Sequence, residues 1–128
     1  MILDTHAWLW YYLGDGQLSR HARAMIEDRT QTKFVSLASC WELAIKVSTG
    51  KYVLAETFSD LFQHSIMDNG FQVLSIELRH VDRVAKLPFP SPHKDPFDRL
   101  LVSQALEEGM PIVSRDESLD AYGVTRLW

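Results

Sequence analysis

Short apolar runs alternate along this chain with segments that have the spacing of helices. The apolar runs are typical of buried strands and lie at residues 1–3, 33–36, 72–76, 111–114 and 124–128. The intervening segments carry apolar residues at helical spacing and end at residues that favour helix caps. A chain in which strands and helices alternate favours an α/β fold with a mainly parallel sheet. This alternation is the strongest constraint on what the chain can form.

The expected helices follow from capping residues and apolar spacing. Ser19 is a suitable cap for one helix, and Asp95 followed by Pro96 is typical of the first turn of another. Three prolines between residues 87 and 94 predict an extended loop, and no repeat or linker divides residues 1–128, so we expect a single domain. Helices are expected at residues 5–13, 19–29, 37–49, 57–69, 77–86 and 96–108, with one further turn at 117–121.

Composition excludes several classes of protein. Hydrophobic residues make up 46% of the 128 residues, which is enough for a real core. The lone Cys40 cannot form an internal disulfide and is expected in the core of a protein from a reducing compartment. No basic leader is visible and no apolar run approaches the roughly 20 residues that span a bilayer, so we expect a cytoplasmic protein without a membrane partner. The net charge of -4 argues against binding long nucleic acid through bulk charge, but it leaves room for a nuclease with a local basic rim.

Four carboxylates lie beside apolar segments: Asp4, Glu42, Asp98 and Asp116. Ligands bind an open parallel sheet beyond the carboxyl ends of its strands, and Asp4 and Asp116 fall there. Glu42 lies in a helix that is apolar nearly all round, where an unpaired carboxylate is costly. Each acid also has a local alternative role. Asp4 and Asp116 could cap helices, and Asp98 could interact with the free N–H groups at the start of its helix. Glu42 could pair with Lys46, which would stabilise the helix by about 0.2 to 0.5 kcal/mol.

The four acids together say more than each alone. Two ionised carboxylates about 4 Å apart repel by about 4 kcal/mol at an effective dielectric constant of about 20, so a converging group needs protons or a cation. A site made only of oxygens suits Mg²⁺ or Mn²⁺. The five histidines have no paired helical spacing and there is one cysteine, which argues against zinc.

The order and spacing of four motifs match a known family nearly end to end. The motifs are Leu3-Asp4-Thr5-His6, then Val35-Ser36 with Trp41-Glu42-Leu43-Ala44-Ile45-Lys46, then Asp95-Pro96-Phe97-Asp98-Arg99-Leu100-Leu101 with Gln104-Ala105, and Val113-Ser114-Arg115-Asp116. The closing Tyr122-Gly123-Val124 fits as well. On these motifs the chain resembles the PIN-domain ribonucleases, in particular the VapC-type toxins of bacterial toxin–antitoxin pairs.

The resemblance implies an α/β/α sandwich that cleaves RNA with Mg²⁺ or Mn²⁺. The family's acidic quartet maps onto Asp4, Glu42, Asp98 and Asp116, which we expect to be both catalytic and metal-binding. Asp4 and Asp98 are the expected direct ligands, whereas Asp95 is assigned to helix capping. Ser114 and Thr5 are expected to support the site. The expected reaction is phosphodiester hydrolysis in which the cation activates water and neutralises charge on the phosphoryl oxygens.

The resemblance also implies a homodimer and a VapB-like antitoxin whose tail covers the active-site groove. Part of the aromatic stretch at residues 8–12 belongs to the core, and the remainder could form an interface. Basic residues near the acids could contact phosphates of the RNA, or could be solvated or paired with neighbouring acids. These basic residues are Lys46, His93, Lys94, Arg99 and Arg115.

Two other classes of protein remain alternatives. A non-catalytic partner-binding module with this fold would bind an antitoxin, and its RNA turnover would be unaffected by Asp4→Asn. A phosphoacceptor signalling domain also gathers acids and Mg²⁺ at strand ends. That class needs an aspartate on a central strand and a lysine after the last strand. Here the segment 72–76, taken as the middle strand, ends in Glu77, and residues 124–128 close the chain without lysine.

Overall fold

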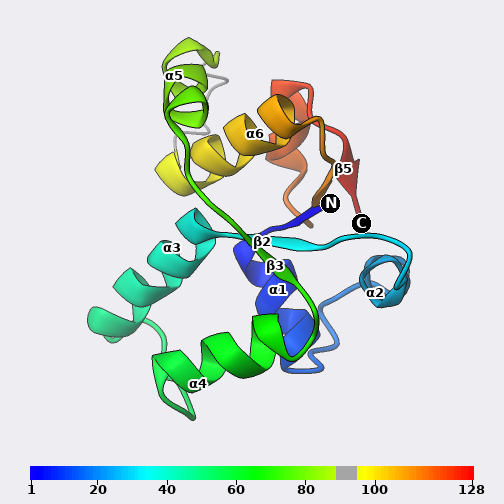
Figure 1. The fold of residues 1–128 in the computed structure, drawn as a ribbon, viewed down its shortest axis with the longest axis vertical. Coiled ribbons are helices and arrows are strands. Elements are labelled where there is room, and N and C mark those ends of the chain that lie inside the picture. The colour runs from blue at the N-terminus through cyan, green and yellow to red at the C-terminus, as the bar shows by residue number, and fades with distance from the viewer. Residues whose placement is uncertain (89–94) are drawn as a thin grey trace.

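A five-stranded parallel sheet forms the centre of the protein (Figure 1). The computed structural model describes residues 1–88 and 95–128. Every pair of neighbouring strands is parallel, in the order β3-β2-β1-β4-β5, which confirms the predicted α/β class. The central strand is therefore β1, and β3, which was predicted to be the middle strand, lies at an edge. The strands are β1 (Ile2–Leu3), β2 (Phe34–Ser36), β3 (Gln72–Leu74), β4 (Ile112–Val113) and β5 (Arg126–Leu127).

Helices connect the strands, and several begin at the predicted caps. The Ser19 and Asp95 side chains accept backbone N–H groups in the first turns of their helices. Gly109 ends the helix that starts at Pro96, with the left-handed φ of 62° that favours glycine. Within the described residues, every helix is too short or too polar to cross a lipid bilayer. The helices are α1 (Thr5–Tyr12), α2 (Arg20–Glu27), α3 (Leu37–Ser48), α4 (Phe58–Phe62), α5 (Leu78–Lys86) and α6 (Pro96–Glu108), with a π-helical turn η1 (Gln63–Met67) and a 3-10 helix η2 (Glu117–Tyr122).

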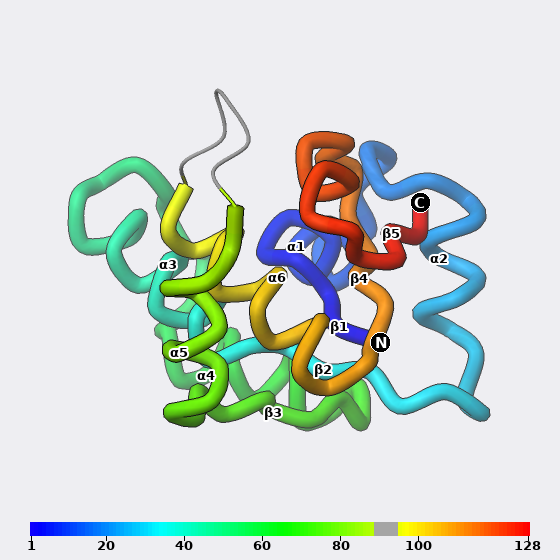
Figure 2. The backbone as a smooth tube through the Cα atoms, turned by 90° about the horizontal axis from the view of Figure 1, so that it is seen from above, coloured from blue at the N-terminus to red at the C-terminus, as the bar shows by residue number. Residues whose placement is uncertain are grey.

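Successive strand residues face opposite sides of the sheet and build two cores. Leu3, Val35 and Val113 pack with buried residues of α1, α2 and α3, whereas Ile2 and Ile112 pack with α6 and η2. Figure 1 shows the two layers, with α5 and α6 above the sheet and α1, α3 and α4 below it. In the view from above, α3 and α5 lie at one end of the molecule and α2 at the other (Figure 2). The protein is therefore an α/β/α sandwich.

The predicted helix at residues 57–69 differs from the structure. It begins at the Thr57 cap as α4 and then widens into the π-helical turn η1, in which the N–H of Asp68 donates to the carbonyl of Gln63. The wider turn leaves both Ser65 and Ile66 fully buried, and the Trp8 indole N–H donates to the Ser65 hydroxyl. This contact joins residues 57 positions apart, so the local apolar spacing does not predict it.

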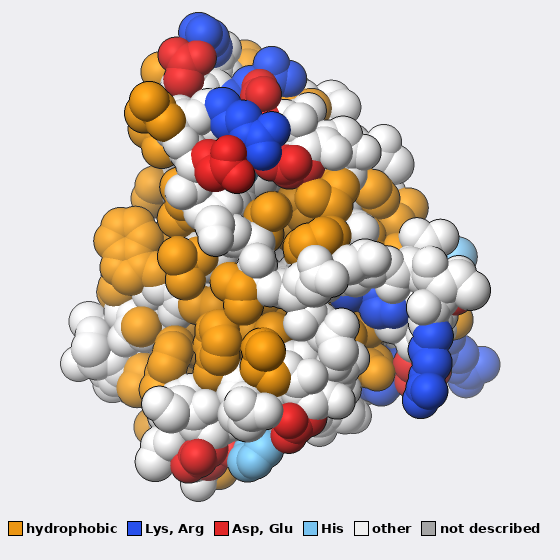
Figure 3. Space-filling model, in the orientation of Figure 1, with side chains coloured by type: hydrophobic (Ala, Val, Ile, Leu, Met, Phe, Trp, Pro, Cys, Tyr) orange, Lys and Arg blue, Asp and Glu red, His pale blue; other side chains and the backbone are white. Residues whose placement is uncertain are grey.

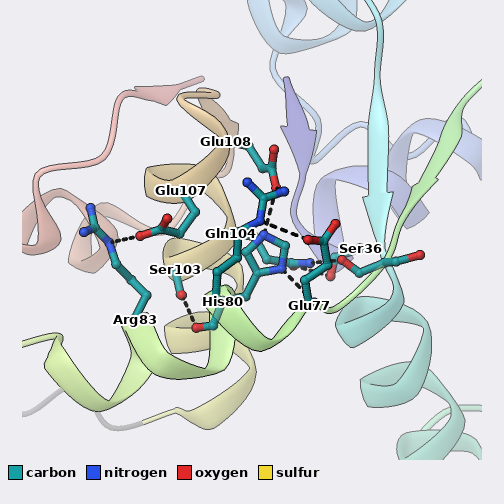
Figure 4. Close-up of polar contacts among 10 residues, drawn as sticks. Ser36, Glu77, His80, Arg83, Ser103, Gln104, Glu107 and Glu108 are labelled. Carbon is teal, nitrogen blue, oxygen red and sulfur yellow. Dashed lines mark hydrogen bonds and ion pairs between the residues drawn. The ribbon is translucent and has the colours of Figure 1, made fainter.

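A buried histidine fixes α5 on α6 (Figure 4). The side chain of His80 is fully buried, and its Nδ1 accepts the backbone N–H of Glu77 at 3.0 Å. Its Nε2 therefore carries the proton and donates to the Glu108 carboxylate at 2.8 Å. The Ser103 hydroxyl of α6 donates to the His80 carbonyl. Two of these polar contacts, from Glu108 and Ser103, thus join the start of α5 to α6.

Candidate active site at the carboxyl edge of the sheet

The strand order reverses direction between β1 and β4. The chain leaves β1 towards β2 on one side of the sheet and continues from β4 to β5 on the other, so the connections after β1 and β4 diverge. Such a switch point leaves a crevice beyond the carboxyl ends of the two strands. A hollow of ≈ 550 Å³ lies there, and it is lined by Asp4, His6, Trp10, Arg115, Asp116 and Glu117. Two of the four predicted acids therefore line one hollow.

Asp4 follows β1 and caps α1. Its carboxylate accepts the backbone N–H of Ala7, as an N-cap does. Burial raises the pKa of this carboxyl group, while the hydrogen bonds from the Ala7 N–H and the Ser114 hydroxyl act in the opposite direction. The nearby Glu42 charge also raises the pKa of Asp4. Capping and the predicted site at Asp4 are thus compatible, because the same carboxyl group lines the hollow.

Ser114 connects Asp4 with Asp116. The Ser114 side chain is fully buried after β4, and its hydroxyl oxygen accepts the Asp116 backbone N–H at 3.0 Å. The same hydroxyl hydrogen-bonds to Asp4. Asp116 is exposed and caps η2 by accepting the N–H of Ser118 at 2.9 Å. The predicted supporting residue thus lies directly between two predicted acids.

Glu42 lies on α3 between a hydroxyl group and an ammonium group. Thr5 donates its hydroxyl to Glu42 Oε2 at 2.5 Å, and Lys46 Nζ lies 2.6 Å from Oε1. The side chain of Glu42 is 15% exposed, so these partners offset much of the cost of burying its charge. The ion pair between Glu42 and Lys46, which the sequence offered as an alternative, is therefore formed. Thr5 follows Asp4 directly, so this contact also brings Glu42 close to Asp4 at the carboxyl end of β1.

Asp98 is partly buried in the first turn of α6. The preceding acid, Asp95, accepts the N–H groups of Phe97 and Asp98, which confirms its assignment to capping. The Phe97 ring meets the Trp41 ring of α3 edge-on, with centroids 5.2 Å apart. Because Phe97 precedes Asp98 and Trp41 precedes Glu42, this contact places the turns that carry the two acids side by side.

A buried polar network holds α3 and α6 on the sheet (Figure 4). The Ser36 hydroxyl at the end of β2 donates to the Gln104 amide oxygen at 2.5 Å, and the Gln104 amide nitrogen donates to the Ser75 carbonyl at 3.1 Å. Ser36 also caps α3 by accepting the N–H of Ala38. In the sequence, Gln104 stands in the third family motif as a polar residue among apolar ones, and no role was expected for it.

Comparison with family models decides the family. The model described as the PIN domain matches residues 1–124. The chain is a PIN domain. Comparison of its sequence with curated proteins finds no match. PIN domains are in general nucleases that depend on divalent metal, so membership supports a nuclease of the hydrolase class.

Two solved structures share the fold of this PIN domain. One is described as FitAB bound to an IR36 DNA fragment, with a TM-score of 0.71 and 15% identity over 98% of this chain and 92% of that chain. The other is VapBC2 from Rickettsia felis bound to a DNA fragment from their promoter, with a TM-score of 0.70 and 14% identity over 98% of this chain and 96% of that chain. At these identities the likeness concerns the fold.

The predicted RNA-contacting residues differ in their surroundings. Arg115 is exposed at the hollow, and Lys46 is paired with Glu42. The prediction for Arg99 needs correction, because this side chain is 4% exposed and its guanidinium donates to the carbonyls of Pro88, Val84 and Leu87. Arg99 anchors the segment after α5 on α6 and is turned away from solvent. His93 and Lys94 lie outside the described residues.

The donor chemistry of this PIN domain fits a hard divalent cation. Asp4, Glu42, Asp98 and Asp116 offer only carboxylate oxygens, which suit Mg²⁺ and Mn²⁺. The raised pKa of Asp4 marks a partly buried acid whose charged form a cation would stabilise. Among residues 1–88 and 95–128, no three Asp, Glu, His or Cys side chains are grouped closely enough to hold a metal ion. The arrangement therefore brings the acids to one edge of the sheet but not into one coordination shell.

Helix α3 exposes a row of apolar side chains. Leu37, Trp41 and Ile45 follow one another at intervals of four residues and are 44%, 57% and 39% exposed. We call these three residues the α3 stripe. Figure 3 shows hydrophobic side chains gathered on the face that includes α3. The sequence predicted a helix that is apolar nearly all round around Glu42, and the structure shows that one of its apolar sides faces solvent.

Proposed function

We propose that this PIN domain is a metal-dependent endoribonuclease toxin that is neutralised by a cognate antitoxin. The observation that carries the proposal is the pairing of Asp4 and Asp116 in one hollow at the switch point, joined by the Ser114 hydroxyl. Glu42 reaches the same edge through Thr5. Burying an acid such as Asp4 at a strand end costs stability, and a bound cation would offset that cost.

Asp4 and Asp98 are the residues that we propose as direct ligands of Mg²⁺ or Mn²⁺, with Glu42 and Asp116 in support. When bound, such a cation supplies Lewis-acid stabilisation of a phosphoryl group and lowers the pKa of water. Ser114 and Thr5 orient Asp4 and Glu42 by hydrogen bonds. Lys46 lies beside Glu42 with its side chain 32% exposed and can contact a phosphate from there.

A second copy of the chain and an antitoxin are the proposed protein partners. The α3 stripe supports a homodimer, because three apolar side chains in a row on a helix favour burial against another surface. The FitAB and VapBC2 structures, which share the fold, support an antitoxin of the VapB kind. A cytoplasmic location and an RNA substrate belong to the same proposal.

Cleavage of total cellular RNA by the purified chain, free of antitoxin, tests the function. The wild type and the variants Asp4→Asn, Asp98→Asn and Asp95→Asn are each assayed in the presence of Mg²⁺, Mn²⁺ or EDTA. Asp95→Asn is the matched control, because asparagine also caps helices and Asp95 serves as the cap of α6.

We expect RNA cleavage that requires metal and persists in Asp95→Asn. In Asp4→Asn and Asp98→Asn the rate of cleavage should fall by about 100-fold or more, as is usual when a charge in the transition state loses its partner. Equal cleavage by all four proteins would indicate a contaminating nuclease. Antitoxin binding without cleavage under any condition would favour the non-catalytic partner-binding module and refute the proposal.

A further inference from the structure

The hollow that contains Asp4 and Asp116 has a second wall made of His6, Trp10 and Arg115. We call these three residues the aromatic wall. His6 is exposed in the first turn of α1, and its ring lies 5.4 Å from that of Trp10, which is partly buried. Arg115 reaches this wall from the segment between β4 and η2. None of the three belongs to the four acids proposed to hold the metal.

Arg115 is held in place by neutral partners. Its guanidinium carbon lies 4.8 Å from the centre of the Trp10 ring, and its Nη1 donates to the Gln17 amide oxygen at 3.3 Å. Arg126, in contrast, binds the Asp120 carboxylate at 2.7 and 3.0 Å. A guanidinium held by an aromatic ring and an amide keeps its positive charge available while losing little further side-chain entropy on binding.

These features fit a nucleotide. Proteins recognise single-stranded RNA by stacking its bases on aromatic rings or on arginine planes, and they bind its phosphates with the same cations. A volume of ≈ 550 Å³ is within the range of small-molecule sites, about 300 to 1,000 Å³. Because Asp4 and Asp116 line the same hollow, a nucleotide bound at the aromatic wall would be a direct neighbour of the phosphate at the acids.

We propose that the aromatic wall binds the nucleotide next to the scissile phosphate of single-stranded RNA, with its base stacked on the Arg115 guanidinium and Trp10 behind it. This inference rests on the proposed ribonuclease function and adds the place where the base of the substrate is held. Stacking on a guanidinium tolerates every base, since each has a π face. The wall therefore contributes affinity and position rather than a sequence-specific contact.

The test is binding of a short fluorescent single-stranded oligoribonucleotide, measured by anisotropy in EDTA so that catalysis does not enter. Wild type is compared with Arg115→Ala, Arg115→Lys and Arg29→Ala. Arg29 is the matched control, because it is an exposed arginine that lines a different hollow together with Lys33 and Asp68. Trp10 is left unchanged because it also packs against the core.

The inference predicts a loss of affinity of about tenfold in Arg115→Ala, within the range for one stacked base. Arg115→Lys keeps the positive charge but lacks the planar guanidinium, so its affinity for the oligoribonucleotide should be nearly as low as that of Arg115→Ala. Arg29→Ala should bind like the wild type. Full affinity in Arg115→Lys would show a phosphate contact without stacking and would overturn the inference.

A second readout separates this inference from the proposed function. If the wild type cleaves RNA and Arg115→Ala binds the oligoribonucleotide as tightly as the wild type, the wall is not the nucleotide site, and the nuclease assignment stands. If Arg115→Ala weakens binding of the antitoxin but not of the oligoribonucleotide, the wall is a protein-docking surface and the inference fails. A wild type that neither binds nor cleaves RNA would refute both.

Discussion

Asp4 performs two tasks with one carboxyl group. It caps α1 through the Ala7 N–H, and it lines the hollow at the switch point. Burial raises the pKa of this carboxyl group, whereas Ala7 and the Ser114 hydroxyl favour its charged form. Asparagine is as good a cap but carries no charge. The substitution Asp4→Asn therefore removes the proposed metal ligand with little effect on the helix, which makes it a suitable probe of the site.

Burial has a different consequence at Cys40. This side chain is 4% exposed in the core, and burial raises the pKa of its thiol to about 11. The thiolate is the reactive form, so at pH 8 the folded protein should react with iodoacetamide far more slowly than the protein unfolded in urea. Mass spectrometry follows the single alkylation, since the chain has one cysteine.

The sign of the pH dependence follows from the same pKa. The folded thiol holds its proton more tightly than the unfolded thiol, whose pKa is about 8.5. The resulting stabilisation is complete below about pH 8.5 and is lost as the pH rises towards 11. Alkylation at equal rates in the folded and unfolded protein at pH 8 would contradict this description of the core.

The elements that carry the acids are held by contacts far apart in the sequence. Ser36 and Gln104 lie 68 positions apart, yet their hydrogen bond joins the start of α3 to α6. The Trp41–Phe97 contact then brings the turns of Glu42 and Asp98 together. Glu42 and Asp98 are thus placed by two contacts, one polar and buried and the other aromatic.

Gln104→Ala should therefore be strongly destabilising. It leaves the buried Ser36 hydroxyl without its acceptor, at about 1 to 3 kcal/mol for a buried group that loses its hydrogen bond. The Ser75 carbonyl belongs to an exposed residue and can bind water instead. We expect the free energy of unfolding in urea to fall by about 1 to 3 kcal/mol. The control is Gln63→Ala, whose exposed amide binds Asp68, with an expected change of about 0.5 kcal/mol or less. Similar losses in both variants would contradict the role of the buried network.

Local signals explain why most elements were predictable. The caps at Ser19 and Asp95 depend on residues within one helical turn, and the apolar runs define the strands. The positions of Asp4 and Asp116 follow from the geometry common to parallel sheets. The π-helical turn η1, the burial of Arg99 and the exposure of the α3 stripe could not be predicted, because each depends on what packs there from elsewhere in the chain.

At the scale of the whole molecule, the hollow of Asp4 and Asp116 and the exposed apolar surface lie on different elements. The hollow of Asp4 and Asp116 opens at the carboxyl edge of the sheet, whereas the α3 stripe covers one side of α3. With a net charge of -4, the chain cannot hold RNA by bulk charge, so binding must come from local cations such as Arg115.

The α3 stripe predicts the oligomeric state. Trp41, at its centre, is 57% exposed, and a charge in its place would have to be desolvated in a dimer. Trp41→Glu should convert a dimer of the wild type to monomer in multi-angle light scattering, with unchanged circular dichroism. Val53→Glu is the control, because Val53 is 87% exposed and does not belong to the stripe. A wild type that is monomeric, or a Trp41→Glu variant that stays dimeric, would contradict the interface.

We propose that the four acids form one metal site when a cation binds, although in this structure they are not grouped closely enough to hold an ion. The most direct measurement is titration with Mn²⁺, with the free ion followed by electron paramagnetic resonance. We expect the wild type and Asp95→Asn to bind Mn²⁺, and Asp4→Asn and Asp98→Asn to lose this binding. Equal Mn²⁺ binding by all four proteins, or none by the wild type, would contradict it.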